Sequence, residues 1–407
     1  MILKDKRLHA ILTANLFSSI GLGISGTVVT WNLIQSANGA QLYGYVIAVM
    51  NITMFLILPY LGTMVDRYSR KKVIIFAEVF GLTITFLVLC FGYVSQGLDV
   101  WHFVVLLMLS YIYYPLQIPA KIALCQEIFD ASQYRTLNSA LEIQGQTAAM
   151  ISAGITALAM KYLSLFTILW IDVLTYVIAI SFIMFIPYTA KQSERLQKSK
   201  AWANISEGFM YLKNRKRLLL FLLGTFIPFV MVMIGNYINP IHIKDTLGAG
   251  LEVFASFEMF YAIGAILAGF MMTILMKKYG DFTACFTMMI IFTIGMMSII
   301  IIPNVAMLLV ASLLFGLGNA GTRVGRNVIM MKIVPNDIIG RVSSFVQGMG
   351  LLIRTTSIFI LSSIIHQIST LHAFSVMTFM LLLALFAVWK VRDTVIEDKV
   401  SVTHVSV

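Results

Sequence analysis

The sequence consists mainly of apolar runs about as long as a membrane is thick, separated by short polar turns. A hydrocarbon core of about 30 Å is crossed by roughly 20 helical residues. Because lipid offers no hydrogen-bond partner for backbone N–H and C=O groups, each run is expected to form a helix. The runs predict an all-α integral membrane protein with twelve transmembrane helices. They lie at residues 8–31, 42–61, 73–94, 100–121, 137–160, 164–187, 217–241, 252–276, 282–302, 305–331, 342–366 and 370–390.

The composition agrees with lipid as the solvent. Hydrophobic residues make up 59% of the chain and charged residues 12%, whereas about a quarter of a soluble domain is charged. The net charge of +11 does not indicate a nucleic-acid partner, because the basic residues stand in turns between apolar runs. Three cysteines, Cys90, Cys125 and Cys285, have no paired spacing. They predict neither a disulfide framework nor a metal site, and we expect no cofactor.

The basic residues fall in every second turn, which orients the chain. Lys and Arg collect in the short loops on the cytoplasmic side of a membrane. We therefore expect both termini to be cytoplasmic, in the cell membrane of a bacterium. Lys161 and Lys244 are the basic residues expected on the other side. The residues expected on the cytoplasmic side include Lys4, Lys6, Arg7, Arg67, Arg70, Lys71, Lys72, Arg135, Lys277, Lys278, Lys332, Arg341, Lys390, Arg392 and Lys399.

A polar stretch from Pro187 to Arg217 separates six runs from six. The turns at 128–139 and 333–344 are similar to each other, and each precedes the fifth helix of its half. Such a repeat is typical of alternating-access carriers with a site between the halves; chance similarity of two amphipathic turns is the alternative. We predict a six-helix bundle at 1–187, a cytoplasmic linker with a short amphipathic helix on the membrane surface at 188–216, a second bundle at 217–391 and a cytoplasmic tail at 392–407.

The turn between the second and third runs carries a specific motif. It reads Gly62-Thr63-Met64-Val65-Asp66-Arg67-Tyr68-Ser69-Arg70-Lys71-Lys72, which resembles the Gly-x-x-x-Asp-Arg-x-x-Arg-Lys signature of the major facilitator superfamily. The resemblance implies the fold of that family, two pseudo-symmetric bundles. It also implies a conformational latch between the halves, formed by Gly62, Asp66, Arg67, Arg70 and Lys71. A plain topology signal is the alternative. The corresponding turn of the second half has Thr273 in place of the acid.

Weaker marks make the chain similar to one branch of that family, the macrolide-efflux proteins and transmembrane secretion effectors. The similarity implies export of a small amphipathic compound, driven by the proton gradient. Drug:proton antiporters of the family usually carry a Gly-Pro-rich motif in the fifth helix, and residues 145–154 contain no proline. The marks are Pro119-Ala120, Leu137-Asn138-Ser139-Ala140, Asp172 and Gly340-Arg341-Val342.

Polar residues inside the apolar runs are the candidate site. A charge at the centre of a bilayer costs about 2.5–3.5 kcal/mol on the insertion scale, so it needs a partner or a cavity. Glu258 and Arg354 lie deepest in their runs. Lys121 and Glu142 can instead pair with each other, and Arg326 can instead extend to the headgroups. The residues predicted to contact substrate or to couple protons are Asn15, Tyr114, Glu142, Glu258, Asn319, Arg323 and Arg354.

Three substrates remain open from the residues alone. The first is a small amphipathic compound. The second is an anionic metabolite such as a polycarboxylate siderophore, suggested by Arg323, Arg326 and Arg354 against Glu258; the third is a lysolipid, moved by a flippase. The sequence has no His or Cys cluster, nucleophile elbow or HExxH motif, so we expect no enzyme. We expect a monomer whose partners are a small-molecule substrate, the proton gradient and membrane lipid.

Overall fold

We analysed a computed structural model of the chain, which describes residues 5–130, 133–159, 162–188, 201–335 and 338–393. These residues form thirteen α-helices and one π-helical turn, and no β-strand. The all-α prediction is thereby confirmed. The chain divides into two compact units, Met1–Ser199 and Lys200–Val407.

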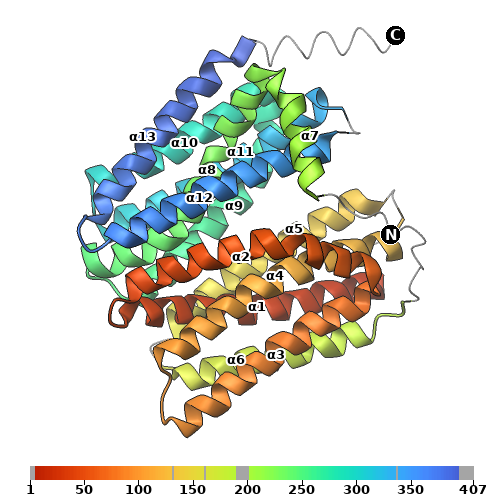
Figure 1. Cartoon of the computed structure of the whole chain (residues 1–407), viewed down its shortest axis with the longest axis vertical. Helices are drawn as coiled ribbons and strands as arrows, with labels where there is room; N and C mark the ends of the chain where they lie inside the picture. Colours follow the sequence, from red (N-terminus) through yellow and green to blue (C-terminus); the bar gives the residue numbers. More distant parts are fainter. Residues whose placement is uncertain (1–4, 131–132, 160–161, 189–200, 336–337, 394–407) are drawn as a thin grey trace. The chain divides into compact units, whose positions relative to one another are not determined.

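Unit 1 is a bundle of six long helices. Within it α1 packs against α5 and α6, and α3 packs against α4 and α6. Polar side chains begin several of these helices: the Asp5 carboxylate accepts from the Arg7 N–H at 2.8 Å, and the Ser164 hydroxyl accepts from the Thr167 N–H at 3.2 Å, as N-caps do. The helices are α1 Lys6–Gln35, α2 Gly39–Arg67, α3 Arg70–Val94, α4 Val100–Ile128, α5 Tyr134–Ala159 and α6 Leu165–Met184 (Figure 1).

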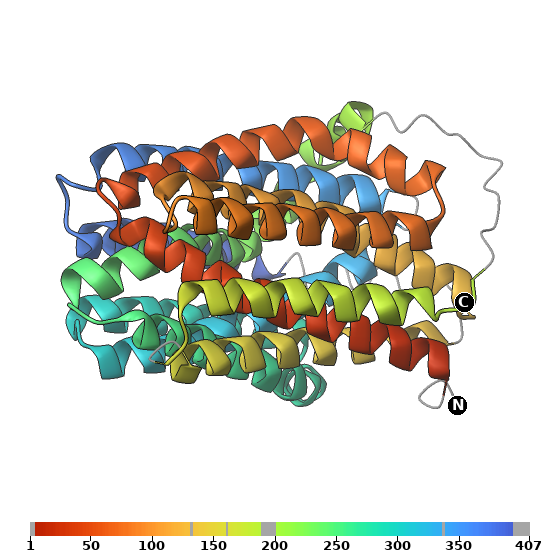
Figure 2. The same ribbon diagram turned by 90° about the horizontal axis from the view of Figure 1, so that it is seen from below.

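Unit 2 repeats this six-helix order after one short helix. The long helices of each unit run side by side, and their connecting turns gather at the two ends (Figure 2). Among the described residues, eleven helices are long and apolar enough to cross a membrane; α5 is a long helix that is not among these eleven. The helices are α7 Ala201–Lys213, α8 Lys216–Ile241, α9 Leu251–Tyr279, α10 Asp281–Ile301, α11 Val305–Ile333, α12 Ile339–Ile364 and α13 Thr370–Lys390, with the π-helical turn His242–Thr246 after α8.

Two glycines let α9 and α11 cross very closely. A Cβ on Gly316 would lie 1.9 Å from the carbonyl oxygen of Tyr261, and one on Gly264 would lie 2.1 Å from that of Leu313. Small residues are what permits such close approach between membrane helices. The Ser312 hydroxyl also donates to the Phe257 carbonyl across this crossing, at 2.5 Å. The crossing fixes the axial position of α11 relative to α9. It therefore determines which polar residues of the two helices are in contact.

We expect Gly316→Ala to destabilise the protein, because the new methyl group would overlap the backbone of α9. Overpacking of this kind costs about 1–3 kcal/mol. Gly269→Ala is the matched control: it lies in α9, and a Cβ there would meet nothing within 4 Å. The two variants are compared by thermal unfolding in detergent. An unchanged melting temperature for Gly316→Ala would contradict the close crossing.

Helix α7 lies in the predicted linker and packs along α12 (Figure 1). A Cβ on Gly208 would lie 2.2 Å from the carbonyl oxygen of Arg341. Beside it Glu207 forms an ion pair with Arg341, with 2.5 Å between the carboxylate oxygen and the guanidinium nitrogen. The ring centres of Phe209 and Phe345 lie 5.4 Å apart. One face of α7 is therefore attached to the start of α12. That α7 lies on the membrane surface stays a prediction.

In each unit an ion pair joins the ends of the third and fourth long helices. The helix that carries the base in unit 1 carries the acid in unit 2. In unit 1 the Arg70 Nε of α3 lies 3.3 Å from the Glu127 Oε1 of α4. In unit 2 the Lys332 Nζ of α11 lies 2.6 Å from the Asp281 Oδ2 of α10. Arg70 and Asp281 are each the first residue of the third long helix of their unit. The acid and the base have thus exchanged helices between the two halves.

Candidate functional site

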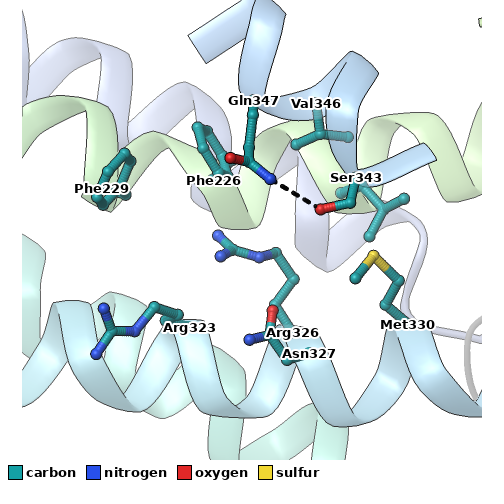
Figure 3. Close-up of a pocket in the computed structure, with 10 residues that line it drawn as sticks. Phe226, Phe229, Arg323, Arg326, Asn327, Met330, Ser343, Val346 and Gln347 are labelled. Atoms are coloured by element: carbon teal, nitrogen blue, oxygen red, sulfur yellow. Dashed lines mark hydrogen bonds between the residues drawn. The ribbon is translucent and has the colours of Figure 1, made fainter. Parts of the chain in front are cut away.

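A cavity of about 250 Å³ opens among α8, α11 and α12 of unit 2. Its polar side consists of Arg323, Arg326, Asn327, Ser343 and Gln347, and the Gln347 amide donates to the Ser343 hydroxyl at 3.0 Å (Figure 3). The other described lining residues are apolar, and none of the lining residues that the structure describes is acidic. They are Leu222, Phe226, Phe229, Met330 and Val346.

Arg326 is the most buried of the charged lining residues, with 8% of its surface exposed. Its guanidinium points from α11 toward Phe226 and Gln347 (Figure 3). One N–H donates to the Thr225 carbonyl at 3.1 Å, and the Cζ lies 4.8 Å from the centre of the Phe226 ring, a cation–π distance. Arg326 therefore does not extend to the headgroups, which was one of the two expectations for it.

A second cavity, of about 160 Å³, holds Glu258 of α9. The Tyr261 side chain, one turn further along α9, lines it together with Asn236 and Asn239 of α8. Apolar side chains form the rest of the wall, among them Phe257, Phe292 and Phe374. Glu258 is only partly buried. A carboxylate inside a membrane helix that opens on a cavity can bind a cation or exchange a proton.

At the α9–α11 crossing, the predicted site residue Asn319 bonds to a residue that lines the smaller cavity. The Asn319 amide of α11 donates to the Tyr261 hydroxyl at 2.7 Å, and Asn319 itself is buried. One turn later Arg323 lines the larger cavity. Tyr261 thus lines the cavity of Glu258 and bonds to the helix that carries Arg323. Arg354 lies in α12 and is not among the residues that line either of these two cavities.

In unit 1 Asn15 is the centre of a buried polar network. Its amide oxygen accepts from the Gln117 amide at 3.0 Å and from the Lys121 ammonium at 2.7 Å, and its amide nitrogen donates to Gln144. The network joins α1, α4 and α5. Lys121 therefore has a neutral partner in Asn15. The side chain of Glu142, its predicted partner, lies outside the described residues, and Tyr114 packs edge-on against Tyr113 at 5.6 Å.

Sequence reasoning missed Glu78, the most buried of the acids that the structure describes in unit 1. Glu78 of α3 has no exposed surface; it accepts from the Ser18 hydroxyl at 2.9 Å and from the Tyr113 hydroxyl at 2.7 Å. It shares a small cavity with Asn15 and Lys121. The signal was present in the sequence, because Glu78 is the sole charge in the stretch from Val73 to Val94.

Asp172 of α6 is a second buried acid in the same bundle, 2% exposed. It lies against α1, where a Cβ on Gly21 would meet its Oδ1 at 2.6 Å. Glu78, Asp172 and Lys121 interact electrostatically across the bundle. Burial makes the ionised form of such acids costly unless it is compensated.

The motif that covers the end of α2 and the start of α3 is described in part. The side chains of Gly62, Asp66 and Arg67 lie outside the described residues. Arg70 pairs with Glu127. The Lys71 ammonium donates to the carbonyl oxygens of Met184 and Ile186 at 2.9 and 2.8 Å, at the end of α6, where the helix dipole favours a cation.

Tyr188 extends this cluster beyond the membrane-spanning helices. Its hydroxyl donates to Glu127, the carboxylate that also pairs with Arg70. Partial burial and this hydrogen bond raise the pKa of Tyr188, so its hydroxyl stays a donor at neutral pH. The basic end of the motif thus fastens together the ends of α3, α4 and α6.

The model of the Major Facilitator Superfamily matches residues 11–354 and 221–403. No curated protein matches the sequence.

Solved transporters share the fold along almost the whole chain. The nucleoside transporter NupG is 15% identical, with a TM-score of 0.70 over 95% of this chain and 98% of that one. A bacterial homologue of the iron transporter ferroportin in the inward-facing state is 15% identical, with a TM-score of 0.68 over 97% and 98%. A D-xylose–proton symporter is 16% identical, with a TM-score of 0.69 over 94% and 96%. At these identities the likeness shows the fold and says nothing about the substrate.

Proposed function

The chain belongs to the major facilitator superfamily of secondary transporters, and we propose that it exports a small amphipathic compound by alternating access, driven by the proton gradient. The observation that carries the proposal is the 250 Å³ cavity of unit 2. Arginine and amide groups form one side of it and aromatic rings the other. Such a mixed wall suits a ligand with one polar end and one apolar end.

Proton coupling is supported by the acids that the membrane helices bury. Glu78 interacts with Asp172 and with Lys121 in unit 1, and Glu258 lines a cavity of unit 2. Ionisable residues inside membrane helices are costly, and they commonly mark proton and substrate pathways. We propose Glu78 with Asp172 as the proton site, and Glu258, Asn319 and Arg323 as substrate contacts.

Export is supported by the likeness to the macrolide-efflux branch, and the orientation by the basic turns. We propose that both termini and the linker at 188–216 are cytoplasmic. A reporter enzyme fused after Val407 tests this orientation. Activity of that reporter outside the cell would contradict it.

Transport itself is tested in inverted membrane vesicles, in which an exporter accumulates its substrate inside. A panel of radiolabelled amphipathic compounds, cationic, neutral and anionic, is offered with the proton gradient imposed. We expect at least one compound to accumulate, and an uncoupler to abolish its accumulation. Accumulation that persists with the uncoupler would exclude proton coupling. Accumulation in right-side-out vesicles, but not in inverted ones, would exclude export.

An anionic metabolite is the second candidate substrate, because the described residues that line the larger cavity include two arginines and no acid. A lysolipid remains the third. A cationic drug is disfavoured at this cavity, since it would meet like charge.

A further inference from the structure

The larger cavity of unit 2 contains a buried cation that lacks a matching acid. In the described part of the chain, the Arg326 guanidinium contacts the Thr225 carbonyl and the Phe226 ring, both of them neutral, and no acidic residue lines its cavity. A guanidinium that is removed from water without a counter-ion is strongly disfavoured. A bound anion would supply the missing charge.

A second cationic side chain lines the same cavity. Arg323 lies three residues earlier on α11 than Arg326, and positions three apart share one face of a helix. An anion that binds at the buried Arg326 therefore has a second guanidinium group within the same cavity.

The other residues that line the cavity favour a ligand with hydrogen-bonding and apolar groups in addition to a negative charge. Gln347 and Ser343 offer hydrogen-bonding groups on α12, opposite Arg326 (Figure 3). The rings of Phe226 and Phe229 lie 5.2 Å apart, tilted toward each other, and Phe226 already stacks on the guanidinium. A flat apolar group can pack on these rings while an acidic group beside it reaches the arginines. An inorganic anion would leave the aromatic part of the wall unused.

We propose that this cavity binds an amphipathic anion, with its acidic group at Arg326 and Arg323 and its apolar body against Phe226 and Phe229. The proposal rests on the proposed function, because it names the class of substrate that the transporter carries. Two sources could supply such an anion: a free organic acid, or the headgroup and adjoining chain of an anionic lipid. The chemistry of recognition is the same for both.

The test uses matched probes that differ only in charge. The purified full-length protein is placed in nanodiscs of phosphatidylcholine, and binding of radiolabelled 2-naphthoate is measured with unlabelled 2-naphthamide and inorganic phosphate as competitors. We expect saturable binding of naphthoate. Neither competitor should displace it at equal concentration, because the amide lacks the charge and phosphate lacks the apolar body.

Arg326→Gln should weaken naphthoate binding by roughly thirtyfold or more, as expected when one partner of a buried charge pair is removed. Arg323→Gln should weaken it less, and Arg326→Lys should retain part of it. Arg392→Gln is the matched control, because it removes the same charge from a half-exposed side chain outside the cavity. The comparison of the two probes on the unmodified protein does not depend on any variant folding.

A second series of nanodiscs contains phosphatidylglycerol. Loss of naphthoate binding there, restored in phosphatidylcholine, identifies the anion as lipid; unchanged binding identifies it as a free acid. Equal affinity for naphthoate and naphthamide, or equal binding by Arg326→Gln and Arg392→Gln, would overturn the proposal. Binding in nanodiscs needs neither a proton gradient nor turnover. Failure here is therefore distinct from a failure of export or of coupling in vesicles.

Discussion

Glu78→Gln is expected to abolish proton-driven accumulation of substrate while leaving passive exchange of substrate intact. The variant keeps the size of the side chain and an oxygen that can accept from Ser18 and Tyr113, but it cannot release a proton. Accumulation against a gradient should fall by about an order of magnitude or more if Glu78 is part of the proton pathway. The measurement compares uphill uptake with exchange at equal substrate concentrations in proteoliposomes.

Two variants make this result specific. Ser18→Ala removes one hydrogen bond to Glu78 but keeps the carboxyl group, so coupling should persist with a shifted dependence on pH. Asp172→Asn should impair coupling, since Asp172 belongs to the same buried charge group. If Glu78→Gln accumulates substrate normally while Glu258→Gln does not, the proton site lies in unit 2 and our assignment is wrong.

Asp66→Asn is expected to reduce transport by about tenfold or more while the protein is inserted in normal amount. The family signature implies that this acid stabilises one state of the latch. An acid near a helix N-terminus contributes about 0.3–1 kcal/mol at an exposed site and up to about 2 kcal/mol when partly buried. Two of the basic neighbours keep other partners, since Arg70 pairs with Glu127 and Lys71 with the end of α6. Insertion and folding should therefore survive the substitution.

Initial transport rates and the amount of protein in the membrane are measured together. Glu127→Gln serves as the comparison, because it removes an acid from the same cluster but lies outside the signature. We expect Glu127→Gln to lower the stability of the protein while changing its transport rate little. Normal transport by Asp66→Asn at normal abundance would leave the motif as a topology signal alone.

The fold could be predicted from the sequence because hydrocarbon imposes length and apolarity on each helix. The twelfth apolar run, 370–390, coincides with α13. Other helices extend beyond their runs: α2 continues to Arg67 and α11 to Ile333. Hydrogen bonding inside a helix does not stop at the lipid boundary, so an apolar pattern finds the buried part and underestimates the polar turns that follow. The apolar pattern also does not predict the attachment of α7 to α12, because that attachment depends on Gly208 and Arg341.

The site was harder to predict, because helical periodicity orders residues on one helix but does not pair helices. Residues three or four apart share a helix face, so Asn319 lies on one face of α11 with Arg323, and Glu258 on one face of α9 with Tyr261. The bond from Asn319 to Tyr261 depends instead on how closely two glycines let these helices cross. Glu78 was overlooked for the opposite reason: its neighbours are so apolar that the stretch read as a plain membrane helix. Its partners Ser18 and Tyr113 belong to other helices.

The exchanged ion pairs give two basic residues different tasks at different times. Arg70 and Lys332 belong to the basic turns from which we infer the orientation, and acids hardly affect that choice while a chain inserts. During synthesis each would act as an unpaired positive charge that retains its turn in the cytosol. Only after the helices assemble do Glu127 and Asp281 neutralise them. Insertion thus requires a basic residue in each of these turns. The assembled bundle requires only that the two paired residues have opposite charges. The acid and the base can therefore stand on different helices in the two halves.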